Sequence, residues 1–404
     1  MIRRTLAVAA LVAACALLLV CNPAGTRNSK VPANCQSEQL LIVPQLTDIL
    51  FVIDNSVSMR EEQAGVAAEL PAFVDALQKG AGVENNFQVG VITTSVYQNA
   101  ALPSPPYMDL KLFPDQEGRL RPATLADGGT SRILTASDGA LVSEFATLIQ
   151  QGTVGSGQET PFEAVRLATS SPLTENENAG FLRTGARLVV VVVSDEDDCS
   201  EQVTLTSPLT LAAPPQVSVS TFTNVDYCTL QSSKLGTVDQ YYDVFNALQD
   251  QDGRKRDVLW AAIAPVARTD KTALAVDDNG TPRNIDCPTS NGPGYRHRAM
   301  AEKFNKQLAN LDSICNPSYH DTLINIAALA NITSSIAVRG LPDPGLATVE
   351  ITRGDGAIQK CTVDNGGIRY EEPTLTTDGR IYFLGPCPRL PDDKHVDLKL
   401  LCAG

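Results

Sequence analysis

The stretch Ile49-Leu-Phe-Val-Ile53, followed directly by Asp54-Asn-Ser56-Val-Ser58, decides the fold of this chain. A continuous apolar run of this length is typical of a strand that is buried on both faces of a parallel sheet. Such sheets bind ligands beyond the carboxyl ends of their strands, which is where the oxygen-bearing side chains begin. One carboxylate and two hydroxyls suit a hard cation. Asp54, Ser56 and Ser58 are therefore candidate ligands of Mg²⁺ or Ca²⁺, although the two serines taken alone could equally cap the next helix.

Strands and helices alternate along most of the chain. Apolar residues at three- and four-residue steps predict a helix from about 59 to 77, and Leu188–Val193 is the most strand-like run. The alternation predicts an α/β fold with a doubly wound, mostly parallel sheet over residues 45–335, with insertions at about 97–140 and 199–256. Short strands separated by Gly, Pro, Asp and Asn predict a small antiparallel β-module over residues 336–404.

A second acidic cluster, Ser194-Asp195-Glu-Asp-Asp198, follows the run Leu188–Val193. If the two apolar strands are neighbours, Asp54 and Asp195 come close together, and their charges repel unless a cation lies between them. Asp195 is therefore a further candidate metal ligand. For Glu196, Asp197 and Asp198 we expect a solvated acidic loop, as for most charge runs, with a second cation site as the alternative.

The D-x-S-x-S pattern after the first strand, together with Val189–Asp195, resembles the two signature strand ends of von Willebrand factor type A domains. The resemblance covers roughly residues 45–335 and excludes the C-terminal module. It implies a metal-ion-dependent adhesion site with one position open to an acidic group of a partner. The family also takes a threonine from a loop between the two motifs. Thr160 is the obvious candidate here, and Glu159 is the alternative by its spacing to the following helix; a third carboxylate would favour Ca²⁺.

These features predict a non-catalytic binding protein of the cell envelope that recognises a protein partner through the cation. The 32 Lys and Arg against 46 Asp and Glu give a net charge of −14, which disfavours nucleic acid as a partner. The spacing of the three histidines excludes a helix-borne zinc pair, and neither a phosphate-binding loop nor a G-x-S-x-G elbow occurs. Two alternatives stay open: a secreted metal-dependent hydrolase with Glu159 or Glu196 as general base, and a scaffold whose metal is purely structural.

The first 21 residues have the layout of an export signal, because two arginines precede an apolar run that ends in cysteine. They resemble a bacterial lipoprotein signal. That resemblance implies a lipid on Cys21 or, alternatively, on Cys15, and a membrane anchor through that lipid. Polar residues 22–44 are expected to form a tether. The predicted location is the outer membrane or cell surface, with the periplasm or the medium as the alternative.

Eight further cysteines fit an exported chain with up to four disulfides. Sequence alone cannot choose among the many pairings that eight cysteines allow. Cys199 and Cys228 bracket one loop segment, and theirs is the one pairing that we predict. The other candidates are Cys35, Cys287 and Cys315, and a set expected to staple the C-terminal module, namely Cys361, Cys387 and Cys402.

Overall fold

The central element is a six-stranded sheet in the order β13-β12-β9-β2-β3-β8. Neighbouring strands run parallel, apart from the antiparallel pair of β3 and β8. The strands are β2 (Gln45–Ile53), β3 (Asn85–Thr93), β8 (Leu134–Thr135), β9 (Arg187–Val193), β12 (Val258–Ala264) and β13 (Leu311–Ser313). This computed structural model describes residues 41–400 except 81, 102–107, 202–204, 208–209, 212–216, 220–226, 274–286, 288–289, 291, 340, 342–343, 375–377 and 391.

The strand order confirms the predicted fold class. Renumbered along the chain, the six strands lie in the order 3-2-1-4-5-6, which is that of a doubly wound α/β sheet. The order reverses between β2 and β9. Ligands of such sheets bind in the crevice at this switch point, so the loops after Ile53 and Val193 occupy the position where a site is expected.

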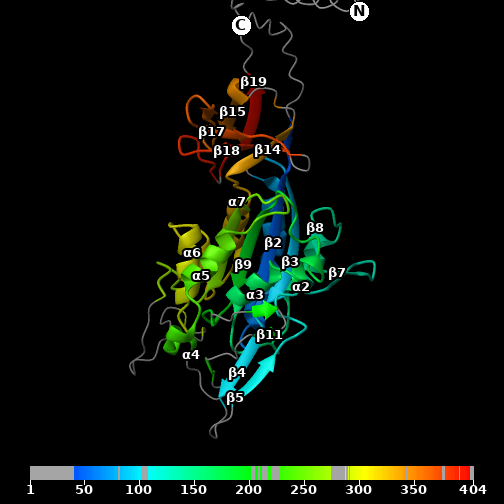
Figure 1. The fold of residues 1–404 in the computed structure, drawn as a ribbon, viewed down its shortest axis with the longest axis vertical. Coiled ribbons are helices and arrows are strands. Elements are labelled where there is room, and N and C mark those ends of the chain that lie inside the picture. Colours follow the sequence, from blue (N-terminus) through cyan, green and yellow to red (C-terminus); the bar gives the residue numbers. More distant parts are fainter. Residues whose placement is uncertain are drawn as a thin grey trace, which may run out of the picture.

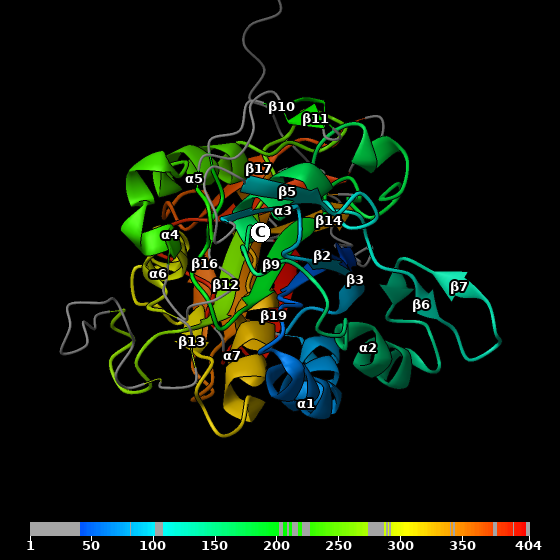
Figure 2. The same cartoon turned by 90° about the horizontal axis from the view of Figure 1, so that it is seen from below.

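Helices cover both faces of the main sheet (Figure 1, Figure 2). They are α1 (Arg60–Lys79), α2 (Leu141–Ile149), α3 (Pro161–Ala168), α5 (Val238–Asn246), α6 (Tyr295–Phe304) and α7 (His320–Ala330). The short helix α4 (Tyr227–Leu230) belongs to the second insertion. Alternate side chains of β2 divide the core into two clusters. Ile49, Phe51 and Ile53 pack with α1, α2 and α7, whereas Leu50 and Val52 pack with α3, α5 and α6.

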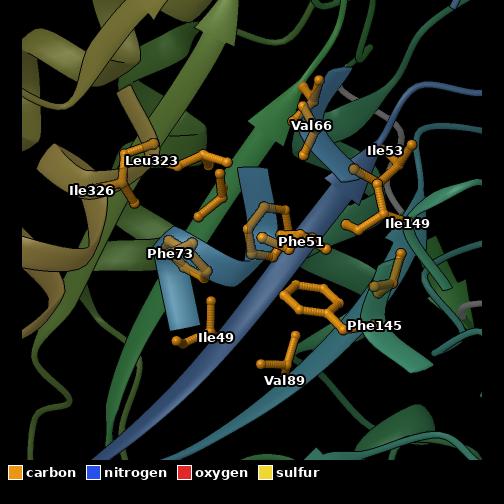
Figure 3. Close-up of a cluster of buried hydrophobic side chains, with 14 of the residues drawn as sticks. Ile49, Phe51, Ile53, Val66, Phe73, Val89, Phe145, Ile149, Leu323 and Ile326 are labelled. Carbon is orange, nitrogen blue, oxygen red and sulfur yellow. The ribbon is translucent and has the colours of Figure 1, made fainter. Parts of the chain in front are cut away.

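Phe51 is the centre of the first of these clusters (Figure 3). Its ring makes edge-to-face contacts with Phe73 of α1 and Phe145 of α2, at centroid distances of 5.6 and 5.2 Å. All three rings are inaccessible to solvent. Aromatic pairs in this geometry stabilise a core beyond the area that they bury, so the packing holds β2 firmly beneath the loop that begins at Asp54.

The two predicted insertions are ordered over the described residues. The first holds a hairpin of β4 (Tyr97–Ala101) and β5 (Met108–Leu112), a second pair of β6 (Ala123–Thr124) and β7 (Thr130–Ser131), and also β8. The first insertion therefore supplies β8, the edge strand of the main sheet. A strand of two residues is too short to be recognised from its sequence pattern. The second contains α4, α5 and the pair β10 (Leu205–Ser207) and β11 (Thr210–Leu211).

The C-terminal module consists of two antiparallel sheets, in the orders β1-β14-β18-β17 and β16-β15-β19. Its strands are β1 (Leu41–Val43), β14 (Ser335–Arg339), β15 (Ala347–Thr352), β16 (Ile358–Cys361), β17 (Ile368–Glu371), β18 (Gly379–Phe383) and β19 (His395–Leu400). Residues 41–43 were expected in the tether, and this was wrong. Their backbone instead pairs with β14, because an edge strand of the module offers unpaired hydrogen-bonding groups. In Figure 1 the module and the β4–β5 hairpin lie at opposite ends of the molecule.

Three disulfides lie within the described residues. The predicted bond between Cys199 and Cys228 is present, and the other two join Cys287 to Cys315 and Cys361 to Cys387. Such bonds indicate an oxidising compartment and hence an exported protein. Cys35, Cys402 and the predicted signal with Cys15 and Cys21 lie outside the described residues. Among the helices that the structure describes, none is both long and apolar enough to cross a bilayer.

Candidate functional site

The predicted metal loop and the second acidic cluster lie side by side at the carboxyl edge of the main sheet. Strands β2 and β9 pair in parallel up to Ile53 and Val193, and the backbone N–H of Asp54 donates to the carbonyl of Val193 at 2.9 Å. Asp54 and Asp195 therefore follow neighbouring strands at the point where the strand order reverses. This is the juxtaposition that the sequence predicts.

Hydroxyl groups link the two loops. Ser58 Oγ donates to Asp195 Oδ1 at 3.1 Å, and Ser56 Oγ lies 3.1 Å from Ser58 Oγ. Ser194 Oγ donates to Asp54 Oδ2 at 2.7 Å, while the other oxygen of Asp54 accepts the backbone N–H of Ser56 at 2.8 Å. Helix α1 begins after Met59 without a side-chain cap, so neither serine serves as its cap. The four residues Asp54, Ser56, Ser58 and Asp195 thus converge.

The two aspartates are buried, and burial changes their acidity. Asp54 is fully buried, and desolvation raises its pKa although Ser194 and Ser56 donate hydrogen bonds to it. Burial and the charge of Asp54 raise the pKa of Asp195 to about 8. Asp195 Oδ2 is buried without a hydrogen-bond partner among the residues that the structure describes. A buried acceptor of this kind costs free energy unless a proton or a cation lies against it.

Glu159 and Thr160, which the sequence could not separate, have different surroundings. Thr160 Oγ1 donates to the backbone carbonyl of Thr94 at 2.8 Å, so this hydroxyl is already engaged. Glu159 is fully buried, and its Oε2 accepts from the hydroxyl of Thr94. Its Oε1 has no partner within the described part of the chain. Burial, with the charges of Asp54 and Asp195 adding to it, raises the pKa of Glu159 well above its ordinary value. The carboxylate of Glu159 therefore interacts with the charges of Asp54 and Asp195, whereas the hydroxyl of Thr160 is held by Thr94.

Sequence reasoning missed two contributors to this centre. Thr94 directly follows β3, which is the same strand-end position that singled out Asp54 and could have identified it. Glu62, in the first turn of α1, has a pKa raised by burial and by the charges of Glu61 and Asp54, and its Oε2 is buried without a partner. Its sequence signal was only an acidic residue near a helix start.

The remaining acidic residues of the second cluster do not form the solvated loop that we expected. Asp198 is fully buried and accepts from the backbone N–H of Phe162, at the start of α3, and from Arg296 Nε at 2.8 Å. Asp197 accepts from the backbone N–H of Arg296, at the start of α6. The first N–H groups of a helix have no partner within it, which explains why these carboxylates are buried there.

A neighbouring loop packs against the D-x-S-x-S segment. The N–H of Gly155 donates to the carbonyl of Asn55 at 2.8 Å, and Ser95 Oγ donates to Asn55 Oδ1 at 2.7 Å. A Cβ at position 155 would lie 2.2 Å from Asn55 Oδ1, so only glycine allows this approach. Both loops carry an exposed valine, since Val57 is 83% and Val154 is 82% accessible. Two apolar side chains therefore stand in solvent beside the polar centre.

The side chains of the polar centre suit a hard cation that takes both carboxylate and hydroxyl oxygens as ligands. Two carboxylates, two serine hydroxyls and an oxygen of Asp195 without a partner match the oxygen chemistry of Mg²⁺, which is held by few carboxylates and keeps several waters. Within the part of the chain that the structure describes, no group of three or more His, Cys, Asp or Glu side chains is arranged to hold a metal ion. Those residues therefore do not form a preformed site of carboxylates alone. The side chains that suit the cation are the two carboxylates together with the two serine hydroxyls.

No family model and no curated protein matches the chain. Among solved structures, a von Willebrand factor type A protein from Catenulispora acidiphila aligns at 12% identity and a TM-score of 0.35, covering 89% of this chain and 58% of that one. The pilus adhesin SpaC from Lactobacillus rhamnosus GG aligns at 11% identity and 0.36, covering 88% and 39%. Proximal thread matrix protein 1 from the mussel byssus aligns at 14% and 0.35, covering 73% and 50%.

The chain thus spans between about two fifths and three fifths of the length of these structures. At TM-scores below 0.5 the alignments carry no argument about function. The functional reading rests on the residues at the sheet edge.

Proposed function

We propose that this protein is an exported, non-catalytic binding protein that recognises an acidic group of a protein partner through a divalent cation. The observation that carries the proposal is the convergence of Asp54, Ser56, Ser58 and Asp195 at the switch point of the sheet. Two buried carboxylates there have raised pKa values, and one of their oxygens lacks a partner. A bound cation would neutralise both and would offer an open position to a carboxylate of the partner.

Glu159 is proposed as the additional ligand from the middle loop, in preference to Thr160. The unpartnered Oε1 and the electrostatic coupling to Asp54 support Glu159, whereas the hydroxyl of Thr160 is held by Thr94. Since the three carboxylates are not arranged as a cage in this structure, cation binding would have to draw Glu159 toward Asp54 and Asp195, and the resulting site would favour Ca²⁺ over Mg²⁺. The exposed Val57 and Val154 would then contact apolar groups that flank the partner's acidic side chain.

The proposed setting is the cell envelope. The disulfides indicate export, and the lipoprotein-like signal with Cys21, or alternatively Cys15, would anchor the protein to the outer membrane or cell surface. A tethered position would keep the cation site accessible to partners in the surrounding space.

Cation-dependent stability tests the proposal directly. We expect millimolar Mg²⁺ or Ca²⁺ to raise the melting temperature of the wild-type protein, because a ligand that binds only the folded state stabilises it by mass action. Asp54→Asn should abolish this rise. Asp75→Asn, which changes an exposed carboxylate of α1 that pairs with Lys79, is the matched control and should keep it.

Partner binding needs a second measurement. Capture of envelope proteins by the immobilised wild-type protein should require the cation. It should be lost with Asp54→Asn and retained with Asp75→Asn. If neither Mg²⁺ nor Ca²⁺ alters the melting temperature of the wild-type protein, the cation site is refuted. If the cation binds but capture is the same for both variants, recognition occurs elsewhere on the molecule.

A further inference from the structure

A cavity of about 640 Å³ lies between the main sheet and the C-terminal module. One wall is formed by residues at or next to the amino ends of the central strands, among them Gln45, Arg187 and Val258. The other wall comes from the module and includes Ser335, Arg369 and Arg380. This position is at the opposite edge of the sheet from Asp54 and Asp195. The proposed cation site therefore does not account for it.

The charged side chains that line the cavity are mostly basic. Six are cationic, namely Arg187, Arg254, Lys255, Arg256, Arg369 and Arg380, and four are acidic, namely Asp250, Asp257, Glu371 and Asp378. The chain as a whole has the reverse balance, with a net charge of −14. A local excess of positive charge in an acidic protein creates a potential that attracts anions.

Two of the four acidic groups are occupied by other partners. Asp378 pairs with Arg339 at 2.8 Å, and Arg339 does not line the cavity. Asp250 accepts backbone N–H groups, from Gly185 at 3.1 Å and from Arg254 at 3.0 Å. The other two pair with arginines of the lining, Asp257 with Arg187 at 3.6 Å and Glu371 with Arg254 at 3.1 Å. Arg256 pairs in addition with the buried Asp48 at 3.6 Å, which is not among the lining residues.

Three guanidinium nitrogen atoms in this wall are buried without a hydrogen-bond partner among the described residues: Arg187 Nε, Arg254 Nη1 and Arg256 Nε. The side chains of Arg187 and Arg256 are only 10% and 2% exposed. Arg187 Nε lies 3.6 Å from Asp257, which is beyond a hydrogen bond. These N–H groups are closed to solvent and therefore do not contact a ligand in the cavity, but their guanidinium charges add to its positive potential.

The two sides of the cavity are already joined by arginine contacts. Arg254 Nε lies 3.1 Å from Glu371 Oε1 of β17, and Arg380 of β18 donates to the carbonyl of Gly185. Arg369 stacks over the ring of Tyr382 at 4.2 Å, which fixes its guanidinium plane at the rim. Arginine forks held in this way recognise oxyanions through paired hydrogen bonds.

We propose that this cavity binds a small ligand with two or more negative charges, of the phosphate or polycarboxylate class, and that the ligand bridges the main sheet and the C-terminal module. Arg254 from one wall and Arg369 from the other, whose side chains are 15% and 54% exposed, supply contacts to the oxyanion, and the buried guanidinium groups of Arg187 and Arg256 add to the positive potential. The inference is independent of the proposed cation-dependent binding, because it uses none of the residues at that edge.

Isothermal titration of the purified protein with pyrophosphate and, separately, with citrate tests the proposal. The buffer is stripped of metals on a chelating resin, and sodium chloride at the same ionic strength measures the screening effect of salt alone. The variants are Arg254→Gln and Arg369→Gln, each of which leaves Glu371 with its other arginine partner. Arg298→Gln, on α6 and outside the cavity, is the matched control.

We expect saturable binding of at least one of the two anions to wild type and to Arg298→Gln. Arg254→Gln and Arg369→Gln should each raise the dissociation constant about tenfold or more, as expected for the loss of one charged hydrogen bond. Which anion binds more tightly distinguishes phosphate from carboxylate chemistry. If Arg254→Gln does not fold by circular dichroism, Arg369→Gln decides alone, since its side chain is 54% exposed. Absence of binding by both anions, or equal affinities in all variants, overturns the proposal.

Discussion

Asp195→Asn should stabilise the cation-free protein and at the same time remove its response to cations. Asp195 is 2% exposed, and its pKa in the folded protein is about 8, against an ordinary value of 3.8. At pH 7 the folded protein must therefore keep a proton on a group that ionises freely in the unfolded chain. This difference costs about 4 kcal/mol as an upper value, from ~1.4 kcal/mol per pH unit between 3.8 and 7. Asparagine removes the cost and can still accept from Ser58.

The effect has a defined dependence on pH. Because the pKa of Asp195 is raised on folding, the stability linked to this group is fully present below the unfolded pKa and is lost as the pH rises through the folded pKa. The stability difference between Asp195→Asn and wild type should thus be near zero at about pH 4, grow up to about pH 8 and stay constant above it. Cation binding to the wild-type protein should strengthen over the same range, since the cation displaces the proton.

Urea denaturation in metal-free buffer from pH 4 to 9 measures both proteins, with the surface variant Asp75→Asn as control. A second series with saturating Mg²⁺ or Ca²⁺ should stabilise the wild-type protein and Asp75→Asn but not Asp195→Asn. A destabilised Asp195→Asn in metal-free buffer at pH 7, or a difference that does not change with pH, would refute the burial argument for this carboxylate.

Other outcomes test further parts of the structure. Glu159→Gln should weaken Ca²⁺ affinity about tenfold or more by calorimetry, whereas Thr160→Val should leave it unchanged, and the reverse order would exclude Glu159 as the ligand. Phe51→Ala should lower the free energy of unfolding, measured in urea, by ~3–5 kcal/mol, because it removes the ring contacts with Phe73 and Phe145 and leaves a cavity. A loss below about 1 kcal/mol would contradict that packing. Replacing Cys199 and Cys228 together by alanine should cost ~3–4 kcal/mol for a loop of 29 residues, measured against the oxidised wild type, and an unchanged midpoint would argue against the bond.

The sequence by itself determined the sheet and the place of its site. The apolar run at 49–53 and the run at 188–193 are encoded by neighbouring residues, so their strand character does not depend on distant contacts. Because parallel strands end at a common edge, the runs place Asp54 and Asp195 at that edge, whereas the pairing of β2 with β9 that brings them together is a tertiary contact. The pairing of Cys199 with Cys228 was likewise accessible, since the two bracket a single segment.

Only the tertiary structure decided features that depend on partners distant in the chain. The different surroundings of Glu159 and Thr160 come from the hydroxyl and the carbonyl of Thr94, which lie 65 and 66 positions away. The burial of Asp198 depends on Arg296 and the start of α3, and a charge run carries no signal of such neighbours. The basic cavity arises for the same reason, because arginines spread from position 187 to position 380 gather only when the module packs beneath the sheet. Local patterns determine the elements, whereas burial and long-range pairing determine what their side chains do.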